Sequence, residues 1–357
     1  MSTATTVPAR PRRWTPRPMR VHHIGTPPMG VGEDPLSTMQ WHVDHRHGAP
    51  MDALPFETDD RRIVSWLNAR QHVSGLVQVR AGASRDYVDM PYYTVADGHQ
   101  LTPANLALGL PQLTELAFTA HDHLIGDDIP DRLQVSVPNA VDLAYFVAGS
   151  IEAAADWMPD MQAMVAGEVA EISARWGQRV RLQLESPAIL LAYHHTQLQD
   201  WPLLTSELVQ QVAGILAAAP AADWVLHVCS ALVEQTNIAA AVPFLNSLAD
   251  LLADLDQPMP VAHLPVVDVD VPPSTDPAFY ADLRRLRRGI DIVAGVVTES
   301  YPEQTQTAVG LIVDALGGPL AGIGARCGFS DRSIAAGAAN AALAASIARA
   351  WTTTPPH

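Results

Sequence analysis

Cysteine is scarce in this sequence, since its 357 residues include only Cys229 and Cys327. Two cysteines so far apart in the chain cannot build the multi-disulfide framework of small secreted domains. Thiols kept reduced for a metal suit the cytosol, so we expect a cytoplasmic protein. Long apolar runs are lacking as well, because no stretch approaches the ~18 residues of a spanning helix. We therefore expect no membrane partner.

Basic side chains are also few, with 22 Lys and Arg against 38 Asp and Glu and a formal net charge of -16. A body this acidic repels phosphate, so nucleic acid is not an expected partner. Residues 1–20 are the exception, since they hold five Arg, four Pro and no acid. No apolar stretch follows the arginines, which predicts a disordered basic tail rather than a secretory signal.

Beyond residue 20, short apolar runs alternate with longer helical patterns, which is typical of βα units around a parallel sheet. Eight runs are predicted as strands: Val21–Gly25, Met51–Phe56, Leu133–Val137, Val180–Glu185, Trp224–Cys229, Val261–Val266, Ile290–Val297 and Leu320–Ala325. Helices are predicted over stretches that include Val165–Trp176, Thr205–Ala218, Ala239–Leu255, Pro277–Arg288, Gln304–Leu316 and Ser333–Trp351. Eight such units predict an α/β fold, a (β/α)8 TIM barrel.

One segment interrupts this alternation. Residues 75–97 alternate apolar and polar side chains on both sides of a turn-like Gly-Ala-Ser at position 82. Such a pattern predicts a β-hairpin inserted into the barrel. We therefore expect a single barrel domain over residues 21–357 that carries this hairpin.

The two cysteines stand at the ends of predicted strands. His227 and Cys229 are two residues apart, so on a strand both side chains point to the same side. Cys327 follows the last predicted strand. The carboxyl ends of barrel strands meet at one rim, and one imidazole with two thiolates suits zinc. The alternative is that both cysteines pack as small apolar residues.

These landmarks resemble the cobalamin-independent methionine synthases in their C-terminal catalytic barrel, and more closely their short single-barrel relatives. His227-Val-Cys229 resembles the His-x-Cys zinc ligands of that family, and the Cys-Gly at Cys327 resembles its later thiolate ligand. Gln183-Leu-Glu-Ser-Pro-Ala resembles its Gln-x-Asp-Glu-Pro-Ala strand end, and Ile24-Gly-Thr resembles its Ile-Gly-Ser. The resemblance spans roughly residues 20 to 350.

The resemblance implies zinc-dependent transfer of a methyl or alkyl group to a small thiol such as homocysteine, with a folate among the candidate donors. It implies that Glu185 binds the amino group of the thiol substrate, while Gly25 and Thr26 meet its carboxylate. Glu57 lies in a segment similar to a pocket-lining stretch of the short relatives. Zinc would make the thiol reactive, because a thiol with a pKa near ~8.5 is mostly protonated at neutral pH.

The sequence departs from that family in three places. The strand that should supply a fourth, acidic ligand contains His263 instead, with Asp268 after it as the alternative. The histidine that should protonate the departing group is missing, which leaves Glu299 as the candidate general acid. Ser186 replaces a second acid.

Other readings stay open. His42, Asp44 and His45 form a rival metal cluster, but they share no face at strand or helix spacing, and nearby Gly and Pro suggest a loop. Two histidine pairs, His22-His23 and His194-His195, lie beside the segments that resemble the family. A metal-free barrel enzyme of the uroporphyrinogen decarboxylase type and a non-catalytic barrel that binds a small molecule are the alternative functions.

Overall fold

The computed structural model describes residues 18–58, 61–82, 89–229, 238–268 and 271–353. The predicted tail at 1–20 lies almost wholly outside these residues. Eight parallel strands form one sheet in the order β1-β10-β9-β8-β7-β6-β5-β2. Their bounds are β1 Arg20–Val21, β2 Leu54–Pro55, β5 Leu133–Pro138, β6 Val180–Glu185, β7 Asp223–His227, β8 Val261–Pro265, β9 Ile292–Gly295 and β10 Gly322–Gly324.

The two edges of this sheet meet. Val21 in β1 bridges Met51 in parallel, and its N–H donates to the carbonyl of Pro50 at 3.0 Å. This contact joins β1 to the segment that leads into β2, so the strand order runs round a barrel. The predicted α/β TIM-barrel fold is confirmed.

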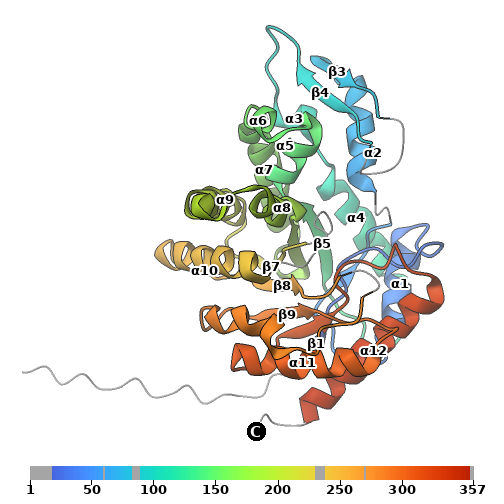
Figure 1. Cartoon of the computed structure of the whole chain (residues 1–357). Coiled ribbons are helices and arrows are strands. Elements are labelled where there is room, and N and C mark those ends of the chain that lie inside the picture. The colour runs from blue at the N-terminus through green and yellow to red at the C-terminus, as the bar shows by residue number, and fades with distance from the viewer. Residues whose placement is uncertain (1–17, 59–60, 83–88, 230–237, 269–270, 354–357) are drawn as a thin grey trace, which may run out of the picture.

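Helices cover the outside of the barrel (Figure 1). The α-helices are α1 Pro35–His45, α2 Arg62–Ala69, α3 Pro103–Leu106, α4 Leu110–His121, α5 Ala140–Ala148, α6 Ile151–Ala154, α7 Met158–Trp176, α8 Pro187–His195, α9 Trp201–Leu216, α10 Ile238–Asp254, α11 Pro302–Leu316 and α12 Ile334–Thr353. Short 3-10 helices are η1 Arg70–His72, η2 Gly177–Arg179, η3 Leu198–Asp200 and η4 Pro277–Arg285. The helix predicted over Pro277–Arg288 is a 3-10 helix that ends at Arg285.

The predicted hairpin is present as the antiparallel pair β3 Leu76–Arg80 and β4 Tyr92–Val95. It projects from one end of the molecule next to α2 (Figure 1). The predicted turn begins at Gly82, and the residues that follow, 83–88, lie outside the described part of the chain. No helix in the described residues is long and apolar enough to cross a membrane.

The core lies between the sheet and its helices. On β5 and β6 the aliphatic residues Val135, Leu182 and Leu184 are fully buried. Their alternating neighbours Gln134 and Gln183 point into the barrel, where both side-chain amides donate to the carbonyl of Ile24, at 3.0 and 2.6 Å. The barrel interior is therefore polar near the end at which the strands stop.

Buried polar contacts also fix the helices. The Glu168 carboxylate on α7 accepts hydrogen bonds from the N–H groups of Leu108, Gly109 and Leu110, at 2.8, 2.9 and 3.0 Å. These donors lie at the start of α4, where the first turn of a helix has no internal acceptors. Gly109 caps this helix with a φ of 77°, a conformation that favours glycine. One acid thus joins α7 to α4.

Candidate metal centre

Three ligand side chains converge at the carboxyl ends of β7 and β10. His227 is the last residue of β7, Cys229 follows it by two residues, and Cys327 follows β10. One ligand atom from each lies within 4.8 Å of the others. Neither cysteine is in a disulfide. The structure therefore brings together the three residues that the sequence predicted as zinc ligands.

The orientation of His227 follows from its neighbours. His263 on β8 is the register partner of His227, and the two Nδ1 atoms are 2.8 Å apart. His263 Nε2 lies 3.1 Å from the carbonyl oxygen of Ala325, which can only accept, so His263 carries its proton on Nε2. His263 Nδ1 must then accept from His227 Nδ1–H. This pairing leaves His227 Nε2 as a bare lone pair.

That lone pair is buried and has no hydrogen-bond partner among the described residues. Burial is the largest cause that holds the pKa of His263 well below its usual range, and His227 and His22 add to it. The lowered pKa keeps the His263 ring neutral, as the assignment of its single proton to Nε2 requires. His227 is therefore set to bind through Nε2 while His263 supports it from behind, an arrangement common around metal-binding histidines.

His263 does not occupy the position that the sequence suggested for it. Both of its ring nitrogens are engaged, one by His227 and one by Ala325, so it lies behind the cluster rather than in it. Gly295 on β9 makes this placement feasible, because a Cβ at that position would lie only 2.8 Å from the His263 ring. Asp268, the alternative ligand, does not belong to the His-Cys-Cys group found in the described residues.

Neighbouring groups lower the pKa of the Cys327 thiol. A hydrogen bond from the Cys229 thiol is the largest cause that holds the pKa of Cys327 well below its usual range, against the opposing effect of burial. The positive charge of Arg326 acts in the same direction. Cys327 therefore favours the thiolate form, which is the form that binds metals and attacks carbon.

The cluster lies in the wall of a cavity of about 320 Å³. That volume suits a small molecule. Its lining includes both thiols and groups from several barrel strands and loops: Ile24, Arg62, Ile63, Pro138, Asp142, Leu143, Phe146, Glu185, Pro187, His227, Cys229, Arg326, Cys327, Gly328, Ser330 and Asp331. A site at the carboxyl end of a barrel is the usual position for an active site in this fold.

The predicted substrate-binding acids lie on one side of this cavity. Glu185 lines it and accepts hydrogen bonds from Gln183 at 2.8 Å and from Arg62 at 3.2 Å. Glu57 is buried behind it, where its Oε1 accepts from the N–H of Ser136 at 2.9 Å. Burial raises the pKa of Glu57, while the charge of Arg62 opposes the shift.

Gly25, Thr26 and Glu299 do not line the cavity. The carbonyl of Gly25 accepts from His42 Nε2 at 2.9 Å, and that of Thr26 accepts from the N–H of Phe329 at 2.9 Å. Thr26 faces an adjacent hollow instead. Glu299 accepts from Asn340 at 2.7 Å and pairs with Arg332 at 3.3 Å. Its carboxylate is thus engaged by two partners outside the lining of this cavity.

Asp142 is a cavity acid that the sequence did not single out. It lies in the first turn of α5, directly after the carboxyl end of β5. It accepts from the hydroxyl of Ser186 at 2.5 Å and from the N–H of Ala188 at 2.6 Å. Burial is the largest cause that raises its pKa to about 7. Its position just after a strand end was the signal that could have revealed it.

The rival histidine cluster is part of a helix, so its prediction as a loop was wrong. His42 and His45 belong to α1, whose first turn is capped by Asp34 and Ser37. His42 Nε2 donates to the carbonyl of Gly25, and His42 Nδ1 pairs with His23 Nδ1 at 2.8 Å. Within the described ranges, the only group of three or more metal-ligand side chains is the one around His227.

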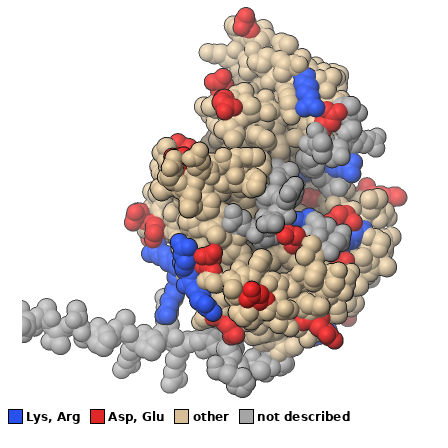
Figure 2. Space-filling model, viewed as in Figure 1, with Lys and Arg blue, Asp and Glu red and all other residues tan. Residues whose placement is uncertain are grey.

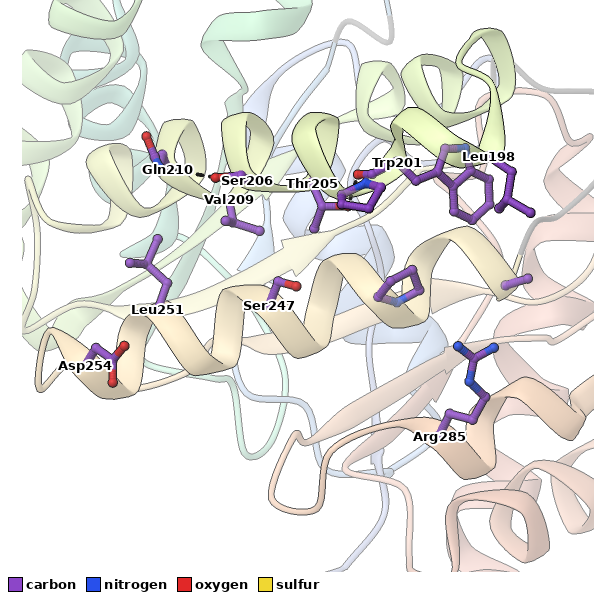
Figure 3. Close-up of a pocket in the computed structure, with 13 residues that line it drawn as sticks. Leu198, Trp201, Thr205, Ser206, Val209, Gln210, Ser247, Leu251, Asp254 and Arg285 are labelled. Carbon is purple, nitrogen blue, oxygen red and sulfur yellow. Dashed lines mark hydrogen bonds between the residues drawn. The ribbon is translucent and has the colours of Figure 1, made fainter.

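A larger hollow of about 890 Å³ lies outside the barrel, between α9 and α10. Figure 3 shows its lining residues, among them Trp201, Leu251 and Arg285, extending from these two helices and from η4. None of the ligand cluster lines it. On the face shown in Figure 2, basic side chains form small separate groups among scattered acids.

No family model and no curated protein matches this sequence. Among solved structures, the chain is similar to a B12-independent methionine synthase from Shewanella sp. W3-18-1 in complex with selenomethionine. The likeness has a TM-score of 0.54 and 12% identity, and it covers 93% of this chain and 98% of that one. A broad-specificity GH5-4 endoglucanase from Clostridium acetobutylicum is similar at a TM-score of 0.33 and 8% identity, over 90% of this chain and 96% of that one. That likeness is too weak to support a conclusion. The likeness to the methionine synthase supports the barrel fold.

Proposed function

We propose that this protein is a zinc-dependent transferase that moves a methyl or other alkyl group onto a small thiol. The observation that carries the proposal is the convergence of His227, Cys229 and Cys327 on one point in a cavity wall. The chemistry is the one that the sequence motifs imply, and the fold of the methionine synthase from Shewanella is compatible with it.

The donor set fits zinc. Typical bonds are about 2.3 Å from zinc to sulfur and about 2.0 Å to nitrogen, so ligands on a tetrahedral ion lie roughly 3.5 to 4 Å apart. The three ligand atoms lie within 4.8 Å of one another, so small side-chain rotations suffice. The unpartnered His227 Nε2 is the orphan atom that such an ion would satisfy. Three protein ligands leave a fourth position for a substrate sulfur.

When bound, zinc would lower the pKa of a substrate thiol so that its sulfur reacts as a thiolate. The chain's own residues have supporting roles. His263 holds His227 in the tautomer that presents Nε2. Glu185 and Arg62 form a charged wall on which a substrate can be oriented. Asp142, with its pKa of about 7, is suited to exchange a proton near neutral pH.

The proposed acceptor is a thiol such as homocysteine, and a folate is one of the donors to be tried. Glu299 keeps the role of general acid only if the loop after β9 moves, because it pairs with Arg332 and Asn340 outside the cavity. Asp142 replaces it as the candidate proton donor, since it lines the cavity. We expect the protein to act in the cytoplasm, where its thiols stay reduced.

Metal analysis by mass spectrometry is the decisive experiment. We expect about one zinc per chain in the wild type, and its loss in both Cys229→Ser and Cys327→Ser. His194→Asn is the matched control, because this exposed histidine on α8 lies outside the cluster. The zinc-loaded protein is then incubated with homocysteine and a series of methyl donors, and methionine is measured by chromatography.

The outcomes separate the candidate functions. Zinc loss in both cysteine variants, with methyl transfer to a thiol in the wild type, supports the proposal. A wild type that holds zinc but transfers no methyl group from any donor favours a non-catalytic barrel that binds a small molecule. A wild type that takes up no zinc after reconstitution under reducing conditions favours a metal-free barrel enzyme.

A further inference from the structure

The acids that line the cavity all have partners. Asp142 accepts from Ser186 and from the backbone of Ala188. Glu185 accepts from Gln183 and pairs with Arg62 at 3.2 Å. The remaining lining acid, Asp331, pairs with its neighbour Arg332 at 2.9 Å. Among the lining residues that the structure describes, no carboxylate is therefore left to attract a new cation.

Arg62 and Arg326 line the cavity, and they differ in whether an acid compensates their charge. Arg62 lies between Glu185 and Glu57, at 3.2 and 3.9 Å, so its charge is compensated. Arg326 lines the same cavity beside Cys327, and its Nε atom is buried without a hydrogen-bond partner. No ion pair joins its guanidinium to an acid in the described part of the chain. The uncompensated charge in this cavity is therefore positive.

An amino group would face competition here. To bind Glu185, the ammonium group of an amino acid must displace the guanidinium of Arg62, which already forms a charge-assisted hydrogen bond with that carboxylate. An acid group meets no such competitor, because Arg326 offers free donors in the fork geometry that carboxylates and related oxyanions match. Arg326 directly precedes Cys327, so an acid group there lies close to the thiols.

We infer that the thiol acceptor is a small anionic thiol whose acid group is bound by Arg326, and that it needs no amino group. This inference rests on the proposed thiol transfer and specifies its substrate class. A cavity of about 320 Å³ accommodates such a molecule with its sulfur toward His227 and the two cysteines. A carboxylate and a sulfonate share the required chemistry.

Isothermal titration of the zinc-loaded full-length protein tests this inference. The probes are 3-mercaptopropionate, 2-mercaptoethanesulfonate, homocysteine and the uncharged 2-mercaptoethanol. We expect one or both of the first two to bind at least tenfold more tightly than 2-mercaptoethanol, and homocysteine to bind no more tightly than 3-mercaptopropionate. The two acid probes distinguish a carboxylate site from a sulfonate site.

Arg326→Gln should remove the preference for anionic thiols, by about 10- to 100-fold in Kd, while binding of 2-mercaptoethanol changes less than threefold. Arg326→Lys should restore part of the preference, because the charge returns without the fork. Arg285→Gln is the charge-matched control, since Arg285 is exposed and lines only the hollow outside the barrel. Zinc content is measured for every variant.

Several results would overturn the inference. Homocysteine binding tenfold more tightly than both acid probes would contradict the claim that the acceptor needs no amino group. An unchanged preference in Arg326→Gln would remove Arg326 from the site, and zinc loss in that variant would mean that its charge supports the thiolates instead. If no thiol binds to wild-type protein that holds zinc, the proposed thiol transfer fails together with this inference.

Discussion

His227 and His263 face each other through their Nδ1 atoms at 2.8 Å, and the carbonyl of Ala325 fixes which of the two rings donates. A second pair repeats the pattern, since His23 and His42 also meet through Nδ1 at 2.8 Å and the carbonyl of Gly25 sets the direction. Only the first pair includes a member of the metal-ligand group of the described residues, namely His227. The second pair therefore offers a control for the first.

Replacing His263 should weaken zinc binding without removing a ligand. We expect His263→Ala to lower zinc affinity by about 10- to 100-fold, because His227 loses the acceptor that holds its tautomer and orientation. Zinc Kd values are measured by competition with a chromophoric chelator. His42→Ala removes an equally buried histidine from the second pair and should leave the zinc Kd within about threefold. Equal losses in both variants would indicate a general destabilisation of the barrel.

Gly295 should also be needed for zinc binding, because it leaves room for the His263 ring that holds His227. Gly295→Ala places a Cβ 2.8 Å from His263 Cε1 and 2.9 Å from Nε2, so the ring must shift. We expect weaker zinc binding and a loss of about 1–3 kcal/mol in unfolding free energy, as is usual for overpacking. Urea denaturation and the chelator assay measure the two effects.

Gly310→Ala is the matched control for Gly295→Ala. Gly310 lies within α11, and a Cβ there meets nothing within 4 Å. The substitution should stabilise the protein by up to about 1 kcal/mol, because alanine favours a helix more than glycine does. A Gly295→Ala variant that binds zinc as tightly as Gly310→Ala would remove the steric argument for His263.

The strands were predictable from the sequence because each is a short β-branched or apolar run, and all eight lie where such runs predicted them. Their lengths were not. The run Val21–Gly25 contributes only Val21 to β1, since the carbonyls of the residues after it accept from side chains of Gln134, Gln183 and His42. A pattern of apolar residues cannot reveal that side chains have replaced the neighbouring strand as partners.

The site was predictable only in part. The cluster of His227, Cys229 and Cys327 followed from residue type and from strand ends that meet at one rim. The supporting role of His263 could not be predicted in this way, because it depends on which atoms form hydrogen bonds with its two ring nitrogens. Asp142 and Arg326 were missed because their importance lies in burial and in the absence of a partner, and neither property is visible in residue order.

Glu168 should be a major determinant of stability. Its carboxylate satisfies three N–H groups at the start of α4, so its removal leaves one buried and two partly buried donors without their acceptor. We expect Glu168→Ala to lower the free energy of unfolding by about 2–4 kcal/mol in urea denaturation. Glu171→Ala is the control, since this neighbouring acid is exposed and pairs only with Arg175 on the surface. An equal, small effect in both would mean that water replaces the lost acceptor.

Asp142 should make stability depend on pH. Its pKa is raised from 3.8 to about 7 in the folded protein, so the unfolded chain ionises first as pH rises. The unfolded state then binds fewer protons, and the contribution of Asp142 to stability falls between about pH 4 and pH 7. Asp142→Asn removes this titration. From pH 5 to pH 8, its unfolding free energy should therefore rise relative to wild type by on the order of 2 kcal/mol.

Urea denaturation at half-unit pH intervals measures this difference. Asp314→Asn on α11 is the control, because this exposed acid carries the same substitution outside the cavity. The difference between Asp142→Asn and wild type should level off above pH 8, since Asp142 is then ionised in both the folded and the unfolded chain. A difference that stays constant from pH 5 to pH 8 would mean that Asp142 is already charged at pH 5. Asp142 would then be unsuited to donate a proton near neutral pH, and another group in the cavity would have to do so.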